Sequence, residues 1–260
     1  MNTKYDARVK EGNTIVCVGL DADFNKLPER FKADALPQFS FCQWIIDETA
    51  EYVAAYKPNC AFFEARGEEG IRELKMICDY LREKYPSHFT ILDAKRADIG
   101  NTNEGYVTMS FDWLGVDAVT LHPYLGKEAL APFLARKDKT SIVLCRTSNP
   151  GAGELQDLVV EGSPLWLTVA QKVVGEWNEN GNCMLVVGAT YPEEMRKIRE
   201  VAPEMTFLVP GVCAQGGDVH AVVEAGGSNL IISSSRGIIF ADDPKRAAQE
   251  LRDEINQYRV

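Results

Sequence analysis

Three closely spaced charged residues, Asp93, Lys95 and Asp98, follow directly on a short apolar run. The run at 89–92 is rich in aromatic and aliphatic residues, which predicts a buried strand whose carboxyl end opens into a functional loop. Asp93 and Lys95 are two residues apart, so in an extended chain their side chains point to the same face. Burying carboxylates beside an ammonium is costly unless each charge is paired, so this cluster indicates chemistry rather than stability.

An Asp-x-Lys pair alone is more often a surface ion pair that contributes little to stability. The chemical interpretation gains support because charged and amide residues also follow the other strand-like runs. These segments are Leu20-Asp21, Lys57-Pro58-Asn59, His122-Pro123-Tyr124, Arg146-Thr147-Ser148-Asn149 and Ser233-Ser234-Ser235-Arg236. Each alone fits a capping or turn residue, but their joint placement favours one shared site.

Two glycine-containing segments predict a phosphate site. Gly216, Gly217 and Gly237 let backbone N–H groups approach an anion, and the start of a following helix adds a favourable partial charge. Arg236 can grip two phosphate oxygens, and Gln215 supplies a neutral donor. Turn geometry explains the glycines of either segment alone, but the two segments together predict a phosphorylated substrate.

Eight β-like runs alternate with helical segments and must position these residues. The predicted strands are 14–20, 52–57, 89–94, 117–121, 141–146, 183–188, 206–210 and 229–233. Strict alternation implies parallel strands joined by right-handed crossovers. Eight such units in 260 residues fit a (β/α)8 TIM barrel better than an open sheet. No repeat or linker divides the chain, so we expect residues 1–260 to form one α/β domain.

Local signals predict where several helices lie and which loops are long. Apolar residues at helical spacing mark helices around 41–48 and 71–81. Pro164 opens another helix, and Thr190-Tyr191-Pro192-Glu193 has the form of a capping box. The segments 21–36 and 149–163 are longer than connections need, which makes them candidate lids.

Composition limits the class of protein. With 45% hydrophobic residues and a net charge of −10, the chain can bury a full core but lacks the basic balance of a nucleic-acid-binding protein. A small anionic ligand stays compatible with that charge. No apolar run reaches membrane-spanning length and residues 1–10 are polar, so we expect a soluble cytoplasmic protein. The seven cysteines stand singly, which favours reduced core thiols over disulfides or a zinc site.

These residues together resemble the orotidine 5'-monophosphate decarboxylases. Residues 93–102 carry the Asp-Ala-Lys-Arg-x-Asp-Ile-Gly-x-Thr motif of the longer bacterial branch of that family. The resemblance runs from Asp21 to Arg236 and includes Lys57, Ser148-Asn149-Pro150-Gly151, residues 210–217 and Ser235-Arg236-Gly237. It implies a barrel that converts orotidine 5'-monophosphate to uridine 5'-monophosphate and CO₂ in de novo pyrimidine synthesis, with no metal and no cofactor.

The resemblance also implies roles for individual residues. Lys57, Asp93, Lys95 and Asp98 would form an alternating charge network, in which Lys95 protonates carbon 6 of the pyrimidine and Asp93 lies against the substrate carboxylate. Asp21 and Lys57 would contact the ribose hydroxyls, Ser148 the amide edge of the pyrimidine, and Gln215 and Arg236 the phosphate. The other implied substrate-binding residues are Asn59, Thr102, Gly217 and Gly237. A homodimer is implied, in which Asp98 and Thr102 reach into the neighbouring subunit's site.

The expected chemistry accounts for the charge cluster. Loss of CO₂ leaves a carbanion in the plane of the ring, so the protein must lower the barrier electrostatically, by ~8–23 kcal/mol or more. An ammonium beside carbon 6 attracts the developing charge and then delivers a proton. Lys95 is expected to stay charged because it is held between Asp93 and Asp98. Phosphate and ribose contacts would position the ring.

Three alternatives stay open at this point. A metal-dependent sugar-phosphate decarboxylase or aldolase of the same barrel group would be expected to carry an acidic ligand at the end of the second strand, where this chain has Lys57. A Schiff-base aldolase would use Lys57 or Lys95 as a nucleophile. A nucleotide-binding barrel without turnover would need no such complete charge network.

Overall fold

The eight apolar runs form the eight parallel strands of a closed barrel in the computed structural model, which describes residues 3–212 and 217–259. Neighbours around the barrel follow the order β1-β10-β9-β8-β5-β4-β3-β2, and β2 pairs with β1 to close it. The strands are β1 Val16–Leu20, β2 Ala55–Pro58, β3 Phe89–Arg96, β4 Ala118–Leu121, β5 Thr140–Arg146, β8 Cys183–Val187, β9 Phe207–Pro210 and β10 Leu230–Ser234. All eight predicted strands are confirmed.

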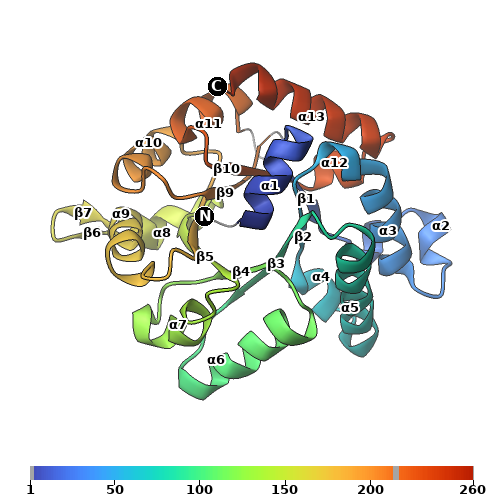
Figure 1. The fold of residues 1–260 in the computed structure, drawn as a ribbon, viewed down its shortest axis with the longest axis horizontal. Coiled ribbons are helices and arrows are strands. Elements are labelled where there is room, and N and C mark those ends of the chain that lie inside the picture. The colour runs from blue at the N-terminus through green and yellow to red at the C-terminus, as the bar shows by residue number, and fades with distance from the viewer. Residues whose placement is uncertain (1–2, 213–216, 260) are drawn as a thin grey trace.

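One outer helix follows each barrel strand and packs outside it, so the chain forms a single-domain (β/α)8 barrel (Figure 1). These helices are α3 Pro37–Thr49, α5 Gly67–Lys84, α6 Gly100–Val107, α7 Gly126–Leu134, α9 Leu165–Lys172, α10 Pro192–Val201, α11 Val219–Gly226 and α13 Pro244–Tyr258. Two of them continue as π-helical turns, α6 through Thr108–Trp113 and α9 through Val173–Trp177. No helix in the described part of the chain is both long and apolar enough to cross a membrane.

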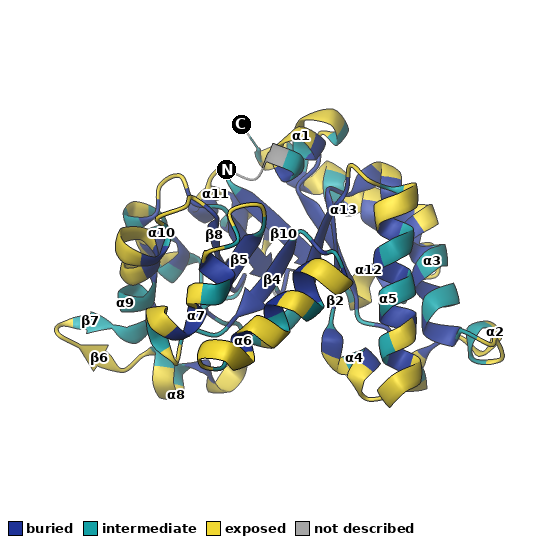
Figure 2. Cartoon of the chain, turned by 60° about the horizontal axis from the view of Figure 1, so that its bottom comes forward, coloured by how far each residue is buried: buried dark blue, intermediate teal, exposed yellow. Residues whose placement is uncertain are grey.

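Short elements fill the loops between strands and outer helices. The short helices are α2 Glu29–Lys32, α4 Cys60–Glu64, α8 Gly153–Gln156 and α12 Arg236–Ile239, with single 3-10 turns at Phe24–Lys26 and Pro150–Ala152. Helix α1 Thr3–Gly12 precedes β1, and a further 3-10 turn, Ala50–Tyr52, follows α3. The hairpin β6 Val159–Val160 with β7 Ser163–Pro164 projects from the barrel, and its first strand is exposed (Figure 2). Both segments predicted as lids, 21–36 and 149–163, therefore carry short structured elements.

One predicted helix start is wrong. The capping box at 190–193 requires Thr190 to be the N-cap, but α10 has Tyr191 as its N-cap and no side chain caps it. Pro192 occupies the first helical position, because its fixed φ suits that place and its missing N–H costs nothing there. Thr190 consequently lies one residue before the cap, and its buried Oγ1 has no hydrogen-bond partner among the described residues.

Two apolar layers stabilise the barrel, one inside it and one between strands and outer helices (Figure 2). The inner layer contains residues such as Phe89, Ile91 and Ile142, whereas the outer layer takes the alternate strand residues. At the amino end, α1 places Tyr5 on the inner layer, where its hydroxyl donates to the carbonyl of Leu230 at 2.6 Å. This plug leaves the carboxyl end of the barrel as the place for a site.

Candidate active site

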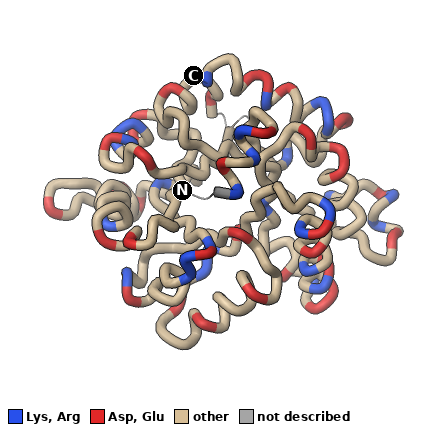
Figure 3. The backbone as a smooth tube through the Cα atoms, in the orientation of Figure 1, with Lys and Arg blue, Asp and Glu red and all other residues tan. Residues whose placement is uncertain are grey.

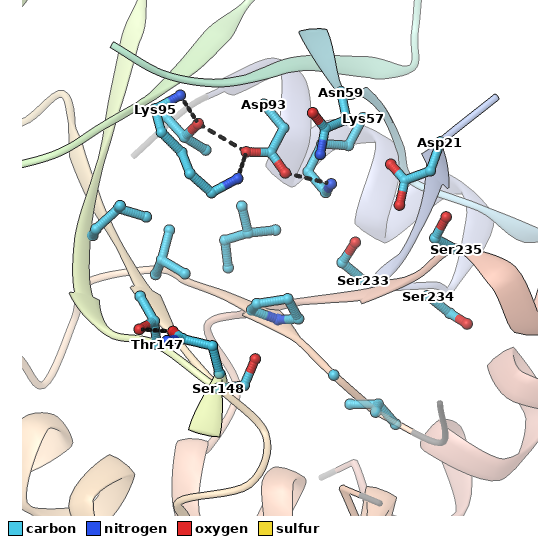
Figure 4. A pocket seen from close by; sticks show the side chains of 18 of the residues that line it. Asp21, Lys57, Asn59, Asp93, Lys95, Thr147, Ser148, Ser233, Ser234 and Ser235 are labelled. Atoms are coloured by element: carbon cyan, nitrogen blue, oxygen red, sulfur yellow. Dashed lines mark hydrogen bonds and ion pairs between the residues drawn. The ribbon is translucent and has the colours of Figure 1, made fainter. Parts of the chain in front are cut away.

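A cavity of about 500 Å³ lies at the carboxyl ends of the strands. Seven predicted site residues line it, from five different strands or the loops after them: Asp21, Lys57, Asn59, Asp93, Lys95, Ser148 and Arg236. Figure 4 shows Lys57, Asp93 and Lys95 on one side of the cavity, with Ser148 on another. The barrel thus brings together residues up to 215 positions apart, as expected from the strand-end positions of these residues.

Asp93 joins two ammonium groups through its two carboxylate oxygens. Its Oδ2 lies 2.9 Å from Nζ of Lys57, and its Oδ1 lies 2.5 Å from Nζ of Lys95 (Figure 4). Burial disfavours the carboxylate, but the attraction of Lys57 and Lys95 outweighs it and holds the pKa of Asp93 well below its usual range. Burial likewise disfavours the Lys57 ammonium, but Asp93 and Asp21 raise the pKa of Lys57 above its ordinary value. Both side chains are therefore charged at neutral pH.

The backbone at Lys95 differs from the extended strand that the sequence predicts. Lys95 has a φ of +48°, and the register between β3 and β4 shifts between Leu92 and Arg96. A bulge of this kind re-aims side chains at the end of a strand. The contact between Asp93 and Lys95 therefore does not come from simple alternation along the pleat, and the left-handed residue stores backbone strain at the site.

Asp98 and Thr102 do not line the cavity of their own chain. Oδ1 of Asp98 accepts a hydrogen bond from its neighbour Ile99 N at 2.7 Å, while buried Asn103 accepts from Asp98 N at 2.9 Å. Thr102 is exposed on α6. Among the described residues, Asp93 is the only carboxylate in ion-pair contact with Lys95. The expected arrangement of Lys95 between Asp93 and Asp98 is thus absent within one described chain.

Further polar residues line the cavity beside the Lys57–Asp93–Lys95 chain. Asp21 follows β1, and its Oδ1 is buried without a hydrogen-bond partner among the described residues. Ser233 and Ser234 end β10, and Ser235 follows and fixes the loop by donating to the carbonyl of Gly19 at 2.9 Å. Asn59 is the N-cap of α4, where its Oδ1 accepts from Ala61 N at 3.2 Å. Asp21 therefore brings a carboxylate to the cavity lining, one oxygen of which is buried without a described partner.

Of the residues of the predicted phosphate site that the structure describes, only one lines the cavity. Arg236 opens α12 at the end of β10, lines the cavity and makes no ion pair with any described residue. Gly217 pairs with Val212 in a β-bridge, and a Cβ there would lie 2.5 Å from that of Ala189. Gly237 is exposed in α12, and neither Gly217 nor Gly237 lines the cavity. Gln215 and Gly216 lie outside the described residues.

Two residues that the sequence reasoning missed hold the site together. Thr120, in β4, contacts the backbone of β3 and the carboxylate of Asp93. Gln156, in α8, accepts from Thr147 N at 2.9 Å and donates to its Oγ1 at 2.8 Å, which ties the 149–163 segment to the end of β5. A strand threonine and a loop glutamine are ordinary in sequence, so no local signal marked either residue.

A model of the orotidine 5'-phosphate decarboxylase / HUMPS family matches residues 14–251. The chain belongs to this family. It is similar to the orotidine 5'-phosphate decarboxylase of Janthinobacterium sp. (strain Marseille), with 46% identity over 266 residues that cover 98% of this chain and 97% of that relative. The family membership suggested by the 93–102 motif is thereby confirmed.

Solved structures of this decarboxylase family share the fold. The Leishmania donovani OMP decarboxylase has a TM-score of 0.88 and 40% identity, covering 98% of this chain and 97% of that one. The Leishmania donovani UMP synthase structure has a TM-score of 0.90 and 42% identity, covering 98% of this chain. This chain spans 55% of the length of that UMP synthase chain.

Compared with the acidic whole chain, the cavity of this family member is locally cationic. Acidic (red) and basic (blue) residues are interspersed along the backbone in Figure 3, and the net charge of the whole chain is −10. The cavity instead has three cationic groups, Lys57, Lys95 and Arg236, against the two carboxylates Asp21 and Asp93. Apolar side chains of Leu144, Val186 and Leu208 line another part of it. An anionic ligand with an apolar part fits this combination.

Proposed function

We propose that this chain catalyses the cofactor-independent decarboxylation of orotidine 5'-monophosphate to uridine 5'-monophosphate and CO₂. Membership of the decarboxylase family and 46% identity to a relative of that name support the reaction. The observation that carries the proposal is the charged chain Lys57–Asp93–Lys95 at the cavity, in which Lys57 and Asp93 are largely buried and Lys95 is half exposed. Structural stability alone does not explain such a chain, because buried ion pairs are weak contributors to stability.

Lys95 acts as the proton donor in this proposal. The ammonium of Lys95, half exposed into the cavity, attracts the charge that develops at carbon 6 and then protonates that carbon. Asp93 stays ionised and holds Nζ of Lys95 in place through its Oδ1. The positions of Asp93 and Lys57 are fixed before substrate binds, so little reorganisation is needed when the carbanion forms.

Substrate binding uses the other walls of the cavity. The carboxylate of Asp21, together with Lys57 and Asn59, binds the ribose hydroxyls, and Ser148 binds the amide edge of the pyrimidine. Arg236 binds the phosphate, since it is cationic and has no described partner. We assign Gln215, Gly217 and Gly237 to the same phosphate group. These contacts lie away from carbon 6, so their binding energy positions the ring.

The active form is a homodimer in this proposal, with Asp98 and Thr102 completing the partner's site. Both residues lie on the carboxyl side of β3 but outside the cavity of their own chain. Large apolar side chains are exposed close to them. Ile99, between Asp98 and Thr102, is 60% exposed, and Tyr124 and Leu125, in the loop after β4, are 84% and 43% exposed. Such exposed apolar surface at the edge of a site favours contact with a second copy.

We place the enzyme in the cytoplasm. The six cysteines that the structure describes are all buried and free, which suits a reducing compartment. Burial also raises the pKa of Cys17 to about 12, so that thiol is inert. Full activity in the presence of a reductant would fit this placement, whereas dependence on an oxidant would contradict it.

A spectroscopic assay of the purified protein with orotidine 5'-monophosphate tests the reaction. We expect the absorbance of the substrate to convert to that of uridine 5'-monophosphate, at the same rate with and without a metal chelator. Binding of the nucleotide without product would contradict the proposal and favour a binding protein. Loss of activity with chelator would favour a metal-dependent relative instead, and borohydride trapping of the substrate on a lysine would reveal a Schiff base.

A further inference from the structure

We propose that Thr120 is a positioning residue that fixes Asp93 and Lys95 in their reactive geometry. The inference rests on the proposed function, because it gives those two residues their chemical roles. Thr120 lies in β4, directly beside the bulged end of β3, and is 1% exposed. Its side chain lines the cavity without being charged. It therefore acts through Asp93 and Lys95 rather than on the reacting atoms.

A single hydroxyl makes three hydrogen bonds at this point. Oγ1 of Thr120 accepts from Ala94 N at 3.0 Å and from Lys95 N at 2.9 Å, and it lies 3.1 Å from Oδ1 of Asp93. A threonine hydroxyl has one donor and two acceptor positions. Since the two backbone N–H groups occupy both acceptor positions, the hydroxyl proton must be donated to Asp93. The direction of every bond is thereby fixed.

The hydroxyl replaces the strand pairing that the bulge removes. Regular pairing of β3 with β4 stops after Leu92↔Val119 and resumes at Arg96↔Leu121. Between these pairs, the N–H groups of Ala94 and Lys95 point to Oγ1 of Thr120 instead of to a strand carbonyl. N–H groups that lose their strand partner in a partly buried place need another acceptor, and the left-handed Lys95 needs surroundings that hold it. Thr120 supplies both.

The same hydroxyl fixes the acid that holds the lysine. Oδ1 of Asp93 receives the bonds from both Thr120 Oγ1 and Lys95 Nζ, and Oδ2 is held by Lys57. Without the hydroxyl, the carboxylate can rotate about Lys57 and carry Nζ of Lys95 with it. A displacement of about 1 Å at a reacting group costs on the order of 10²-fold in rate. Loss of Thr120 should therefore affect the chemical step more than substrate binding.

Thr120→Val tests this inference, because valine keeps the shape of the side chain and removes only the hydroxyl. We expect kcat to fall on the order of 10²-fold. KM and the Kd for uridine 5'-monophosphate should stay within about threefold of wild type, since the residues assigned to nucleotide binding are unchanged. Thr120→Ser, which keeps the hydroxyl, should recover most of kcat. A wild-type kcat in Thr120→Val, or equal losses in kcat and in nucleotide affinity, would overturn the assignment.

Thr90→Val is the matched control, as it makes the same chemical change in β3 away from the cavity. We expect its kcat to equal that of wild type, and a loss as large as that of Thr120→Val would overturn a specific role. If Thr120→Val does not fold, the ratio of kcat between Thr120→Ser and Thr120→Ala isolates the hydroxyl. The inference requires serine to exceed alanine at least tenfold, and equal values refute it.

A crystal structure of Thr120→Val separates this inference from the proposed reaction. We expect Lys95 to leave the left-handed region, or its Nζ to leave Asp93, whatever reaction the wild type catalyses. Unchanged geometry at both residues would refute the inference even if the protein decarboxylates its substrate. Conversely, the wild type could fail to decarboxylate the substrate while Lys95 is displaced in Thr120→Val. That pair of results would refute only the proposed reaction.

Discussion

Lys57 and Asp93 form an ion pair at 2.9 Å in which 7% of the lysine side chain and 13% of the aspartate side chain is exposed. The pair joins β2 to β3 at one side of the cavity. Removing two charges from water costs several kcal/mol, which their attraction offsets only when the geometry is good. The pair holds Asp93 against a third charged group, the ammonium of Lys95.

Lys57→Met should destabilise the protein, because it leaves the Asp93 carboxylate without its most buried partner. We expect the free energy of unfolding to fall by about 3 kcal/mol, measured by urea denaturation at pH 7. The double variant Lys57→Met/Asp93→Leu should regain part of that loss while remaining inactive, since no buried charge is left unpaired. A double variant less stable than the sum of the two single changes would contradict this account.

Lys95→Ala should abolish turnover and leave nucleotide binding measurable. The variant removes the proposed acid, but the cavity walls formed by Asp21, Ser148 and Arg236 stay in place. Isothermal titration with uridine 5'-monophosphate should give a Kd within about tenfold of wild type, because one ammonium contact is lost. Full activity in this variant would refute the role given to the lysine.

Arg236→Ala should weaken binding of phosphorylated ligands selectively. A charge-assisted contact to phosphate contributes about 1.5–3 kcal/mol, so we expect the Kd for uridine 5'-monophosphate to rise at least tenfold. The Kd for uridine, which has no phosphate, should barely change. Equal losses for the two ligands would mean that the phosphate binds elsewhere in the cavity.

Sharing of sites across a dimer can be tested by mixing inactive variants. Asp98→Ala and Lys57→Ala should each be inactive alone, yet their mixture should recover about a quarter of wild-type activity. Random pairing makes half of the dimers mixed, and each mixed dimer has one intact site. A mixture of Asp98→Ala with Thr102→Ala is the control, because every site in its mixed dimers lacks one residue. Recovery in the control, or none in the first mixture, would count against the shared arrangement.

The stability of the fold should fall between pH 6.5 and pH 4 because of His88. Burial lowers the pKa of His88 from 6.5 to about 4, where its Nε2 lies 2.8 Å from the carbonyl of Ala50. Between these two pH values, His88 is therefore protonated in the unfolded chain but neutral in the folded chain. The free energy of unfolding is not reduced by His88 above pH 6.5. It falls progressively as the pH drops towards 4, by about 3 kcal/mol in total.

His88→Gln provides the check on that pH dependence. Glutamine has no titrating group, so this variant should lose less stability between pH 7 and pH 4 than wild type does. Urea midpoints at pH 7, 5.5 and 4 measure the difference for both proteins. Parallel curves for wild type and variant would show that His88 is not responsible.

Local sequence signals predicted the strands and the residues at their ends. Short apolar runs between turns predict the strands. In a barrel, the carboxyl ends of parallel strands then lie at one rim. Asp21, Lys57, Asp93, Ser148 and Arg236 line one cavity for that reason. The 93–102 motif also indicated the family, because several specific residue types recur there at fixed spacing.

Only the tertiary structure decided how those residues are held. The left-handed backbone of Lys95 and its support by Thr120 depend on a hydrogen bond between two strands, and the sequence distance of 25 residues hides it. The contact of Gln156 with Thr147 arises in the same way from a folded loop. A side chain's type and neighbours in sequence give its chemistry, but its hydrogen-bond partners come from segments that meet only when the barrel closes.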